Sequence, residues 1–260
     1  MTHLILKAGG LCFRLNFKES LFFKQFKRAL GHIPKKNKTG TAIEIDVFSK
    51  GKGAGKKKFS QIYQSKNSFW AFNEQYQLCF DKINSRAIIY CARNTHILKN
   101  ALRLLIMAHA NEKDIFLHAS SAKYKGRATI FCGPSGSGKT TITKLLPRKF
   151  DVIGDDLSII KKKNGFYYAF GDSFKQSLNS LEKTKVKEVL FLKKANRNQK
   201  VKISRAKALA LILTRCPLTE EKKEAYNRLK MFNDFVGVVP TYIFKFKNDH
   251  SLTSFFKRCL

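Results

Sequence analysis

Short apolar runs, a few residues apart, dominate the first ninety residues. They lie at residues 4–6, 12–15, 69–72, 77–80 and 87–90, and each has the length of one strand. Gly9-Gly10 separates the first two runs in the manner of a hairpin, and Asn84-Ser85 supplies a turn between the last two. We therefore expect residues 1–93 to form a β-rich N-terminal region that packs on the rest of the chain.

From residue 94 onward, helical and strand-like patterns alternate. Asn94 or Thr95 is a suitable N-cap for a helix whose apolar face would hold Ile97, Ala101, Leu104, Leu105 and Ala108. Strands are predicted at 116–119, 128–132, 152–153, 189–192, 201–203 and 242–246, and a hairpin at 157–170 with Asn164-Gly165 at its tip. Helices are predicted after Thr141, Ser204, Thr219 and either Asp249 or Ser251, and Pro147 should end the first of these. Because strands outnumber helices, we predict a mixed α/β fold, a strand-rich sheet with flanking helices.

Two lysine- and glycine-rich stretches, residues 33–40 and 49–58, interrupt the N-terminal pattern. Their composition predicts an exposed, mobile loop across residues 33–58. The second stretch contains GKGAGKK, but it lacks the Ser or Thr that completes a phosphate-binding loop. We therefore interpret it as a solvated loop.

The net charge is the most unusual feature of the composition. The chain of 260 residues has a formal net charge of +33, with 39 Lys and 12 Arg. Such a charge is compatible with nucleic-acid binding, but Arg, the residue best suited to reading bases, is scarce. We therefore attribute the charge to general lysine usage, with nucleic-acid binding as the alternative.

Neither a membrane nor an oxidising compartment is indicated. The most apolar stretch, residues 101–110, is interrupted by Arg103, and the N-terminus lacks the pattern of a signal peptide. The six cysteines form no CxxC pair, which is typical of reduced thiols. We expect a soluble cytoplasmic protein, and 43% hydrophobic residues are enough for a substantial core.

One stretch, GPSGSGKT at residues 133–140, has the pattern of a phosphate-binding loop. It follows a predicted strand and precedes a predicted helix, as such a loop requires. Its glycines let backbone N–H groups converge on an anion, and the start of the helix adds positive potential. Lys139 is expected to reach the outer phosphates and Thr140 to bind Mg²⁺. The predicted nucleotide-binding residues are Gly133, Pro134, Ser135, Gly136, Ser137, Gly138, Lys139, Thr140 and Thr141.

Two adjacent carboxylates follow this loop, at the end of a predicted strand. The chain has 18 acidic residues and none between Ile115 and Phe150, but Asp155 and Asp156 are neighbours. Two carboxylates in contact repel each other unless a cation or a shared proton compensates. We expect one to bind Mg²⁺ and the other to take a proton from a hydroxyl, with a turn or cap as the alternative role.

Together these residues resemble the core of bacterial HPr kinase/phosphorylase and its shorter relatives. Leu117-His118, Gly126 and the loop from Gly133 keep that family's intervals, and Asp155-Asp156 follow Lys139 at nearly the family's distance. The resemblance covers residues 115–160. It implies a P-loop kinase core with C-terminal helices over residues 94–260, of the type shared with the ATP-dependent phosphoenolpyruvate carboxykinases.

The resemblance also implies roles for single residues. Asp155 resembles the general base that acts on the acceptor hydroxyl, and Asp156 resembles the metal ligand. His118 would lie near Asp155 and orient it, with a structural histidine as the alternative. Lys139 is the third catalytic residue that the resemblance implies. The implied cofactors are ATP and Mg²⁺. Because members of the family form oligomers, the resemblance also suggests a homo-oligomer.

Two departures from the family concern the acceptor. A later Glu-[Ile/Val]-Arg-Gly signature is missing after Asp156, and Thr140-Thr141 replace the usual Ser-Glu. The resemblance therefore implies an acceptor other than HPr, a Ser hydroxyl of a protein or peptide, and short relatives are associated with precursor peptides of modified-peptide gene clusters. Alternatives are a small-metabolite kinase, for which Arg205 and Arg215 are candidate lid residues, and a nucleotide- or nucleic-acid-binding protein without catalysis. A transporter-type ATPase is disfavoured because an LSGGQ-like signature is missing.

Overall fold

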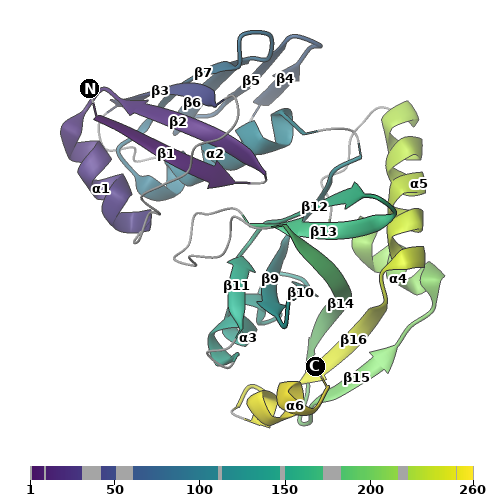
Figure 1. Ribbon diagram of the computed structural model, residues 1–260. Helices are drawn as coiled ribbons and strands as arrows, with labels where there is room; N and C mark the ends of the chain where they lie inside the picture. Colours follow the sequence, from purple (N-terminus) through teal and green to yellow (C-terminus); the bar gives the residue numbers. More distant parts are fainter. Residues whose placement is uncertain are drawn as a thin grey trace. The chain divides into compact units, whose positions relative to one another are not determined.

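The computed structural model describes residues 2–8, 10–30, 42–50, 61–110, 113–146, 150–171, 183–215, 222–249 and 251–259. These residues divide into two compact units, one up to Ala110 and one from Lys113 onward. The sequence pattern placed its boundary between residues 93 and 94, whereas the helix that follows residue 94 belongs to the first unit. Each unit is built on a sheet of its own (Figure 1).

The first unit contains a seven-stranded sheet with strand order β1-β2-β3-β7-β6-β5-β4. Its strands are β1 (Thr2–Ala8), β2 (Leu11–Phe17), β3 (Ile43–Lys50), β4 (Gln61–Gln64), β5 (Ser68–Phe72), β6 (Tyr76–Asp81) and β7 (Arg86–Ala92). All neighbours are antiparallel except β3, which pairs parallel with β2 and with β7. The turns predicted near Gly10 and Ser85 are confirmed, and both residues adopt the left-handed conformation.

Three elements of this unit were not foreseen from the sequence. Helix α1 (Ser20–Leu30) lies where strands and loops were expected, strand β4 was not recognised, and strand β3 occupies the middle of the expected loop 33–58. α1 forms because Phe22, Phe26 and Leu30 recur every fourth residue and are buried on one face. Most of the two lysine-rich stretches lies outside the described residues.

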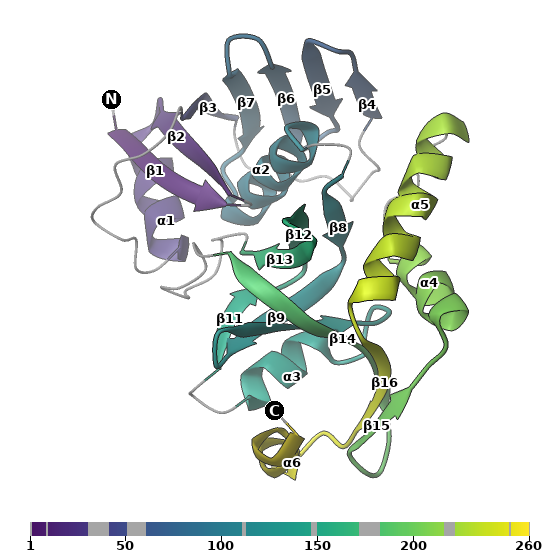
Figure 2. The ribbon, with the colours of Figure 1, turned by 45° about the vertical axis from the view of Figure 1, so that its right-hand side comes forward.

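Helices α1 and α2 (Thr95–Ala108) cover one face of this sheet (Figure 2). Asn94 is the N-cap of α2, as predicted, and its side chain accepts hydrogen bonds from the N–H groups of His96 and Ile97. The buried face of α2 also includes Leu98, Leu102 and Ile106, whereas Leu104 is half-buried. The other face of the sheet leaves large side chains exposed, among them Tyr63, Trp70, Phe72 and Ile88.

The second unit contains a nine-stranded sheet centred on the long strand β14 (Thr184–Lys194). Its other strands are β8 (Ile115–Leu117), β9 (Ala119–Tyr124), β10 (Arg127–Cys132), β11 (Asp151–Gly154), β12 (Ser158–Lys163), β13 (Phe166–Phe170), β15 (Gln199–Lys202) and β16 (Thr241–Phe246). The main order is β11-β9-β10-β14-β13-β12-β8. One edge of β14 pairs in parallel with β10, and the other edge is shared by β13 at its start and β16 from Val189 onward.

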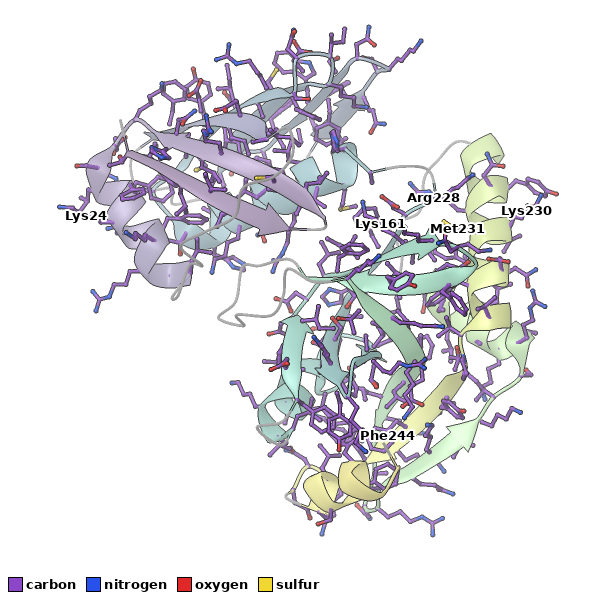
Figure 3. All side chains as sticks on the ribbon, in the orientation of Figure 1. Lys24, Lys161, Arg228, Lys230, Met231 and Phe244 are labelled. Atoms are coloured by element: carbon purple, nitrogen blue, oxygen red, sulfur yellow. The ribbon has the colours of Figure 1, made fainter. Side chains whose placement is uncertain are left out.

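Helices pack on both faces of this second sheet. α4 (Arg205–Leu213) and α5 (Lys222–Val238) contribute Ala208, Ile212, Phe232 and Phe235 to one core cluster. α3 (Lys139–Leu145) and α6 (Ser251–Cys259) contribute Ile142, Leu252 and Phe256 to the other. Phe244, labelled in Figure 3, joins β16 to α6 through ring contacts at 5.2 and 5.4 Å with Phe255 and Phe256.

The predicted fold class, a mixed α/β protein with strand-rich sheets and flanking helices, is confirmed. The hairpin at residues 157–170 is also confirmed, because Asn164 and Gly165 both have positive φ angles between β12 and β13. Ser204 caps α4, accepting a hydrogen bond from Lys207 N–H. Pro147 and Thr219 lie outside the described residues. Where the structure describes the chain, its helices are too short or too polar to span a membrane.

Helix α1 gives a direct test of the first core. Phe26 is fully buried, and its ring centroid lies 5.7 Å from that of Phe17. Phe26→Ala should lower the free energy of unfolding by about 3–5 kcal/mol, because it leaves a cavity. Leu21→Ala on the same helix should cost less than about 0.5 kcal/mol, since Leu21 is 53% exposed. Chemical denaturation of the full chain measures both, and equal losses would argue against a packed helix at residues 20–30.

Candidate functional site

The predicted phosphate loop, residues 133–138, joins strand β10 to helix α3. β10 is buried from Ala128 to Cys132, and α3 begins at Lys139. Gly136 and Gly138 adopt left-handed backbone conformations, with φ angles of 76° and 99°. Residues with a Cβ rarely adopt these angles, so the loop requires glycine at both positions.

The loop is too tightly packed for side chains at two of its glycines. A Cβ on Gly133 would lie 2.4 Å from Ser137 Oγ, and a Cβ on Gly138 would lie 2.6 Å from the ring of Phe246. Ser137 N–H donates to the Pro134 carbonyl at 3.1 Å, whereas the N–H groups of Gly136 and Gly138 find no backbone acceptor among the described residues. The buried Ser137 Oγ also has no hydrogen-bond partner within that set. Backbone N–H groups without backbone acceptors and a buried hydroxyl without a partner, in one tight turn, are features expected of an anion-binding loop.

The side chain of Lys139 folds back over this loop. Lys139 is only 7% exposed, and its Nζ donates to the carbonyls of Gly133 at 2.9 Å and Pro134 at 3.1 Å. Desolvation lowers the pKa of the ammonium below its ordinary value, and the positive charge of Arg215 lowers it further. An anion in the loop would offset both effects, because it would stabilise the charged form.

Asp155 follows β11 and joins two other segments of the unit. Its carboxylate is buried, with 3% of the residue exposed. Oδ1 accepts hydrogen bonds from Ser120 Oγ of β9 at 2.9 Å and from Thr140 Oγ1 of α3 at 3.3 Å. The structure therefore places Asp155 beside the hydroxyl that the sequence predicts to bind Mg²⁺.

Asp156 has different surroundings. It is half-buried and adopts a positive φ of 78°, which is uncommon for a residue with a side chain. His118 lies in the connection between β8 and β9, and the charge and the backbone of Asp156 both raise the pKa of its imidazole. The position of His118 near Asp155, which the resemblance implies, stays a prediction.

The electrostatic environment keeps the imidazole of His118 neutral. Partial desolvation lowers its pKa below the ordinary value of 6.5, and the positive charge of Lys139 adds to this effect. Asp156 raises the pKa of His118 and so opposes the shift, but desolvation and the cations prevail. His118 is therefore largely uncharged at neutral pH.

Arg215, which the sequence named as a candidate lid residue of a small-metabolite kinase, lies beside His118 at the candidate site. Its carbonyl accepts a hydrogen bond from His118 N–H at 3.2 Å, and its guanidinium acts electrostatically on both His118 and Lys139. The other candidate lid residue, Arg205, instead donates to the carbonyl of Asn233 at 2.8 Å. The packing of α4 against the sheet brings Arg215 to His118, and no sequence motif specifies that position.

The donor groups suit a magnesium–nucleotide complex better than a metal held by protein alone. Within the described ranges, no group of three or more His, Cys, Asp and Glu side chains could hold a metal. Thr140 and Asp155 supply a hydroxyl and a carboxylate, which are oxygen ligands of the kind that Mg²⁺ prefers. Mg²⁺ is often held by one or two protein oxygens together with phosphate oxygens of a substrate, and this pair fits such a site.

Comparison with known proteins identifies one family. The model of the family described as SynChlorMet cassette protein ScmC matches residues 91–254, more than half of the chain. No curated protein matches. A solved structure of the Hpr(Ser) kinase/phosphatase from Coxiella burnetii is similar at 13% identity, covering 55% of this chain and 92% of that chain, with a TM-score of 0.31. A similarity at this level supports no assignment of function.

The two left-handed glycines of the loop give a matched test of its packing. Gly136→Ala and Gly138→Ala both introduce backbone strain, but a Cβ on Gly136 meets nothing within 4 Å. At Gly138 it would lie 2.6 Å from the ring of Phe246, which is buried. Gly138→Ala should therefore lower the free energy of unfolding by about 1–3 kcal/mol more than Gly136→Ala. Equal losses in chemical denaturation would show that the contact with Phe246 does not constrain the loop.

The charge of Lys139 can be detected at His118. Because Lys139 helps to lower the pKa of His118, Lys139→Met should raise that pKa toward 6.5. Lys144, an exposed cation in the last turn of the same helix, provides the control: Lys144→Met should leave the titration unchanged. NMR titration of the His118 ring measures both. An unchanged pKa in Lys139→Met would contradict the arrangement described above.

Proposed function

This chain belongs to the family of SynChlorMet cassette protein ScmC, and on that premise we propose that it is an ATP-dependent phosphotransferase acting on a Ser hydroxyl of a protein or peptide. The main support is the meeting of three chemical groups in one unit: the glycine loop, the Thr140–Asp155 pair and Asp156. Phosphoryl transfer requires one group to hold phosphates, one to hold Mg²⁺ and one to accept a proton.

The loop and Lys139 are proposed to bind the phosphates of ATP. The N–H groups of Gly136 and Gly138 lack acceptors within the described residues, and phosphate oxygens would provide them. Lys139 Nζ now donates to two carbonyls, and a phosphate oxygen is a stronger partner because it is charged. Its low exposure strengthens this interaction, since solvent screening is weak there.

Thr140 and Asp155 are proposed to hold Mg²⁺, which when bound neutralises charge on the outer phosphates. The resemblance implied Asp156 as the ligand and Asp155 as the base. The contacts favour the opposite division, because Asp155 is buried and shares a hydrogen bond with the Thr140 hydroxyl. A carboxylate paired with the loop hydroxyl in this way is positioned for the metal, while its low exposure separates it from an incoming acceptor.

Asp156 is proposed to accept the proton of the acceptor hydroxyl. It is more exposed than Asp155, and the neutral His118 lies beside it. In the transfer, the hydroxyl oxygen forms a bond to the terminal phosphorus while the bond from that phosphorus to the bridging oxygen breaks. ADP leaves with the electron pair of the broken bond, and the hydroxyl proton passes to Asp156 and then to water.

Transfer of labelled phosphate tests the proposed activity. The full chain should transfer the terminal phosphate of ATP, with Mg²⁺, to Ser of a peptide or protein encoded by a neighbouring gene. Lys139→Met should weaken MgATP binding by about tenfold to a hundredfold, because a charge-assisted contact is lost, and Lys144→Met should not. Tight MgATP binding without transfer to any of these acceptors would contradict the proposed activity.

The division of roles between the two aspartates requires a separate measurement. Asp155→Asn should weaken the binding of Mn²⁺ in the presence of ATP by at least about tenfold, as measured by electron paramagnetic resonance. Asp156→Asn should leave Mn²⁺ affinity within about twofold of the wild type and yet abolish phosphate transfer. If Asp156→Asn were the variant that loses Mn²⁺, the roles would be those that the resemblance implied.

A further inference from the structure

We propose that the guanidinium of Arg215 binds the terminal phosphate of the nucleotide. This inference rests on the proposed function, because it presumes that the loop at residues 133–138 holds a nucleoside triphosphate. It adds a catalytic residue, from a distant part of the chain, to a site otherwise built from residues 118–156.

The backbone of Arg215 is fixed at the edge of the site from two sides. Its N–H donates to the carbonyl of Ile212 at 2.8 Å, and Ile212 is fully buried in the core cluster beneath α4. Its carbonyl accepts from His118 N–H at 3.2 Å, where β8 passes into β9. Because the backbone of Arg215 is held at this point, its side chain starts close to His118. His118 in turn lies near Asp156 and Lys139.

The positive charges of Arg215 and Lys139 would be stabilised by an anion between them. Arg215 and Lys139 are both cationic and lie within electrostatic range of each other and of His118. Their mutual repulsion disfavours the arrangement unless negative charge is present. Asp156 is the carboxylate that acts on both Lys139 and His118, and it offsets part of this repulsion. A triphosphate brings several negative charges to this position.

Arg215 also has a donor to offer. Its Nε is buried and has no hydrogen-bond partner in the part of the chain that the structure describes. A buried N–H without an acceptor is unfavourable, and a phosphate oxygen would satisfy it. The planar guanidinium suits this task, because adjacent N–H groups can bind two oxygens of one phosphate. Lys139 Nζ, by contrast, already donates to two loop carbonyls.

A purely structural role makes a different prediction. Arg215 lies just after the C-terminal end of α4, where a cation stabilises the helix dipole. Loss of that stabilisation would affect folding alone, and it would not distinguish nucleotides that differ only in their terminal phosphate. The two roles are therefore separable by comparing MgADP with the magnesium complex of β,γ-imido-ATP.

Isothermal titration calorimetry on the full chain makes this comparison. Arg215→Ala should bind MgADP within about twofold of the wild type, but bind the imido analogue at least about tenfold more weakly, because charge-assisted hydrogen bonds to the terminal phosphate are lost. Arg215→Lys keeps the charge but lacks the planar group. Its affinity for the imido analogue should therefore lie between those of the wild type and Arg215→Ala. Lys207→Ala removes an exposed cation from α4, the helix that precedes Arg215, and should match the wild type for both nucleotides.

Each remaining outcome decides a different question. Equal affinities of wild type and Arg215→Ala for the imido analogue, or equal losses for both nucleotides, would overturn the role of Arg215 and leave the proposed function standing. A wild-type protein that binds neither nucleotide would overturn the proposed function and this inference with it. If Arg215→Ala fails to fold, as judged by its melting temperature, Arg215→Lys provides the comparison.

Discussion

The buried carboxylate of Asp155 holds the site together. Its hydrogen bonds to Ser120 and Thr140 tie the end of β11 to β9 on one side and to α3 on the other. β9 lies between β11 and β10 in the sheet, and β10 leads directly into the glycine loop. Because a buried carboxylate is unfavourable unless it is hydrogen-bonded, these contacts fix the three segments at one spacing. The position of Thr140 relative to the loop follows from that spacing.

The same contacts explain why two neighbouring aspartates have different surroundings. The carboxylate of Asp155 is hydrogen-bonded to the hydroxyls of Ser120 and Thr140. At Asp156, by contrast, the left-handed backbone turns the chain. Gly154 permits the tight passage just before them, because a Cβ there would lie 2.8 Å from the Leu157 carbonyl. One short segment thus presents two carboxylates to two environments, which is the condition for two chemical roles.

The parts of the fold that could be predicted are those with strong local signals. Asn164-Gly165, Asn94 and the apolar run before Gly133 each specify their structure within a few residues. Helix α1 and strand β3 were missed because the lysine-rich surroundings concealed a four-residue spacing of Phe22 and Phe26 and a short alternation from Ile43. The loop and the aspartates could be named as candidates from the sequence, and their roles stay predictions. Their residues are close in sequence.

The sequence named Arg215 only as a candidate lid residue of a small-metabolite kinase, and its place beside His118 could not be foreseen for a physical reason. It reaches the site only because β14 pairs with β10, α4 packs on that sheet, and the end of α4 meets the connection between β8 and β9. These contacts join residues that are far apart in the sequence, and a single Arg forms no sequence motif. The net charge of +33 is equally uninformative, because lysines are spread along the whole chain, whereas Lys139 and Arg215 differ from the rest in their surroundings. For the triphosphate binding proposed above, what matters is the low exposure of Lys139 and the placement of Lys139 and Arg215 within electrostatic range of each other.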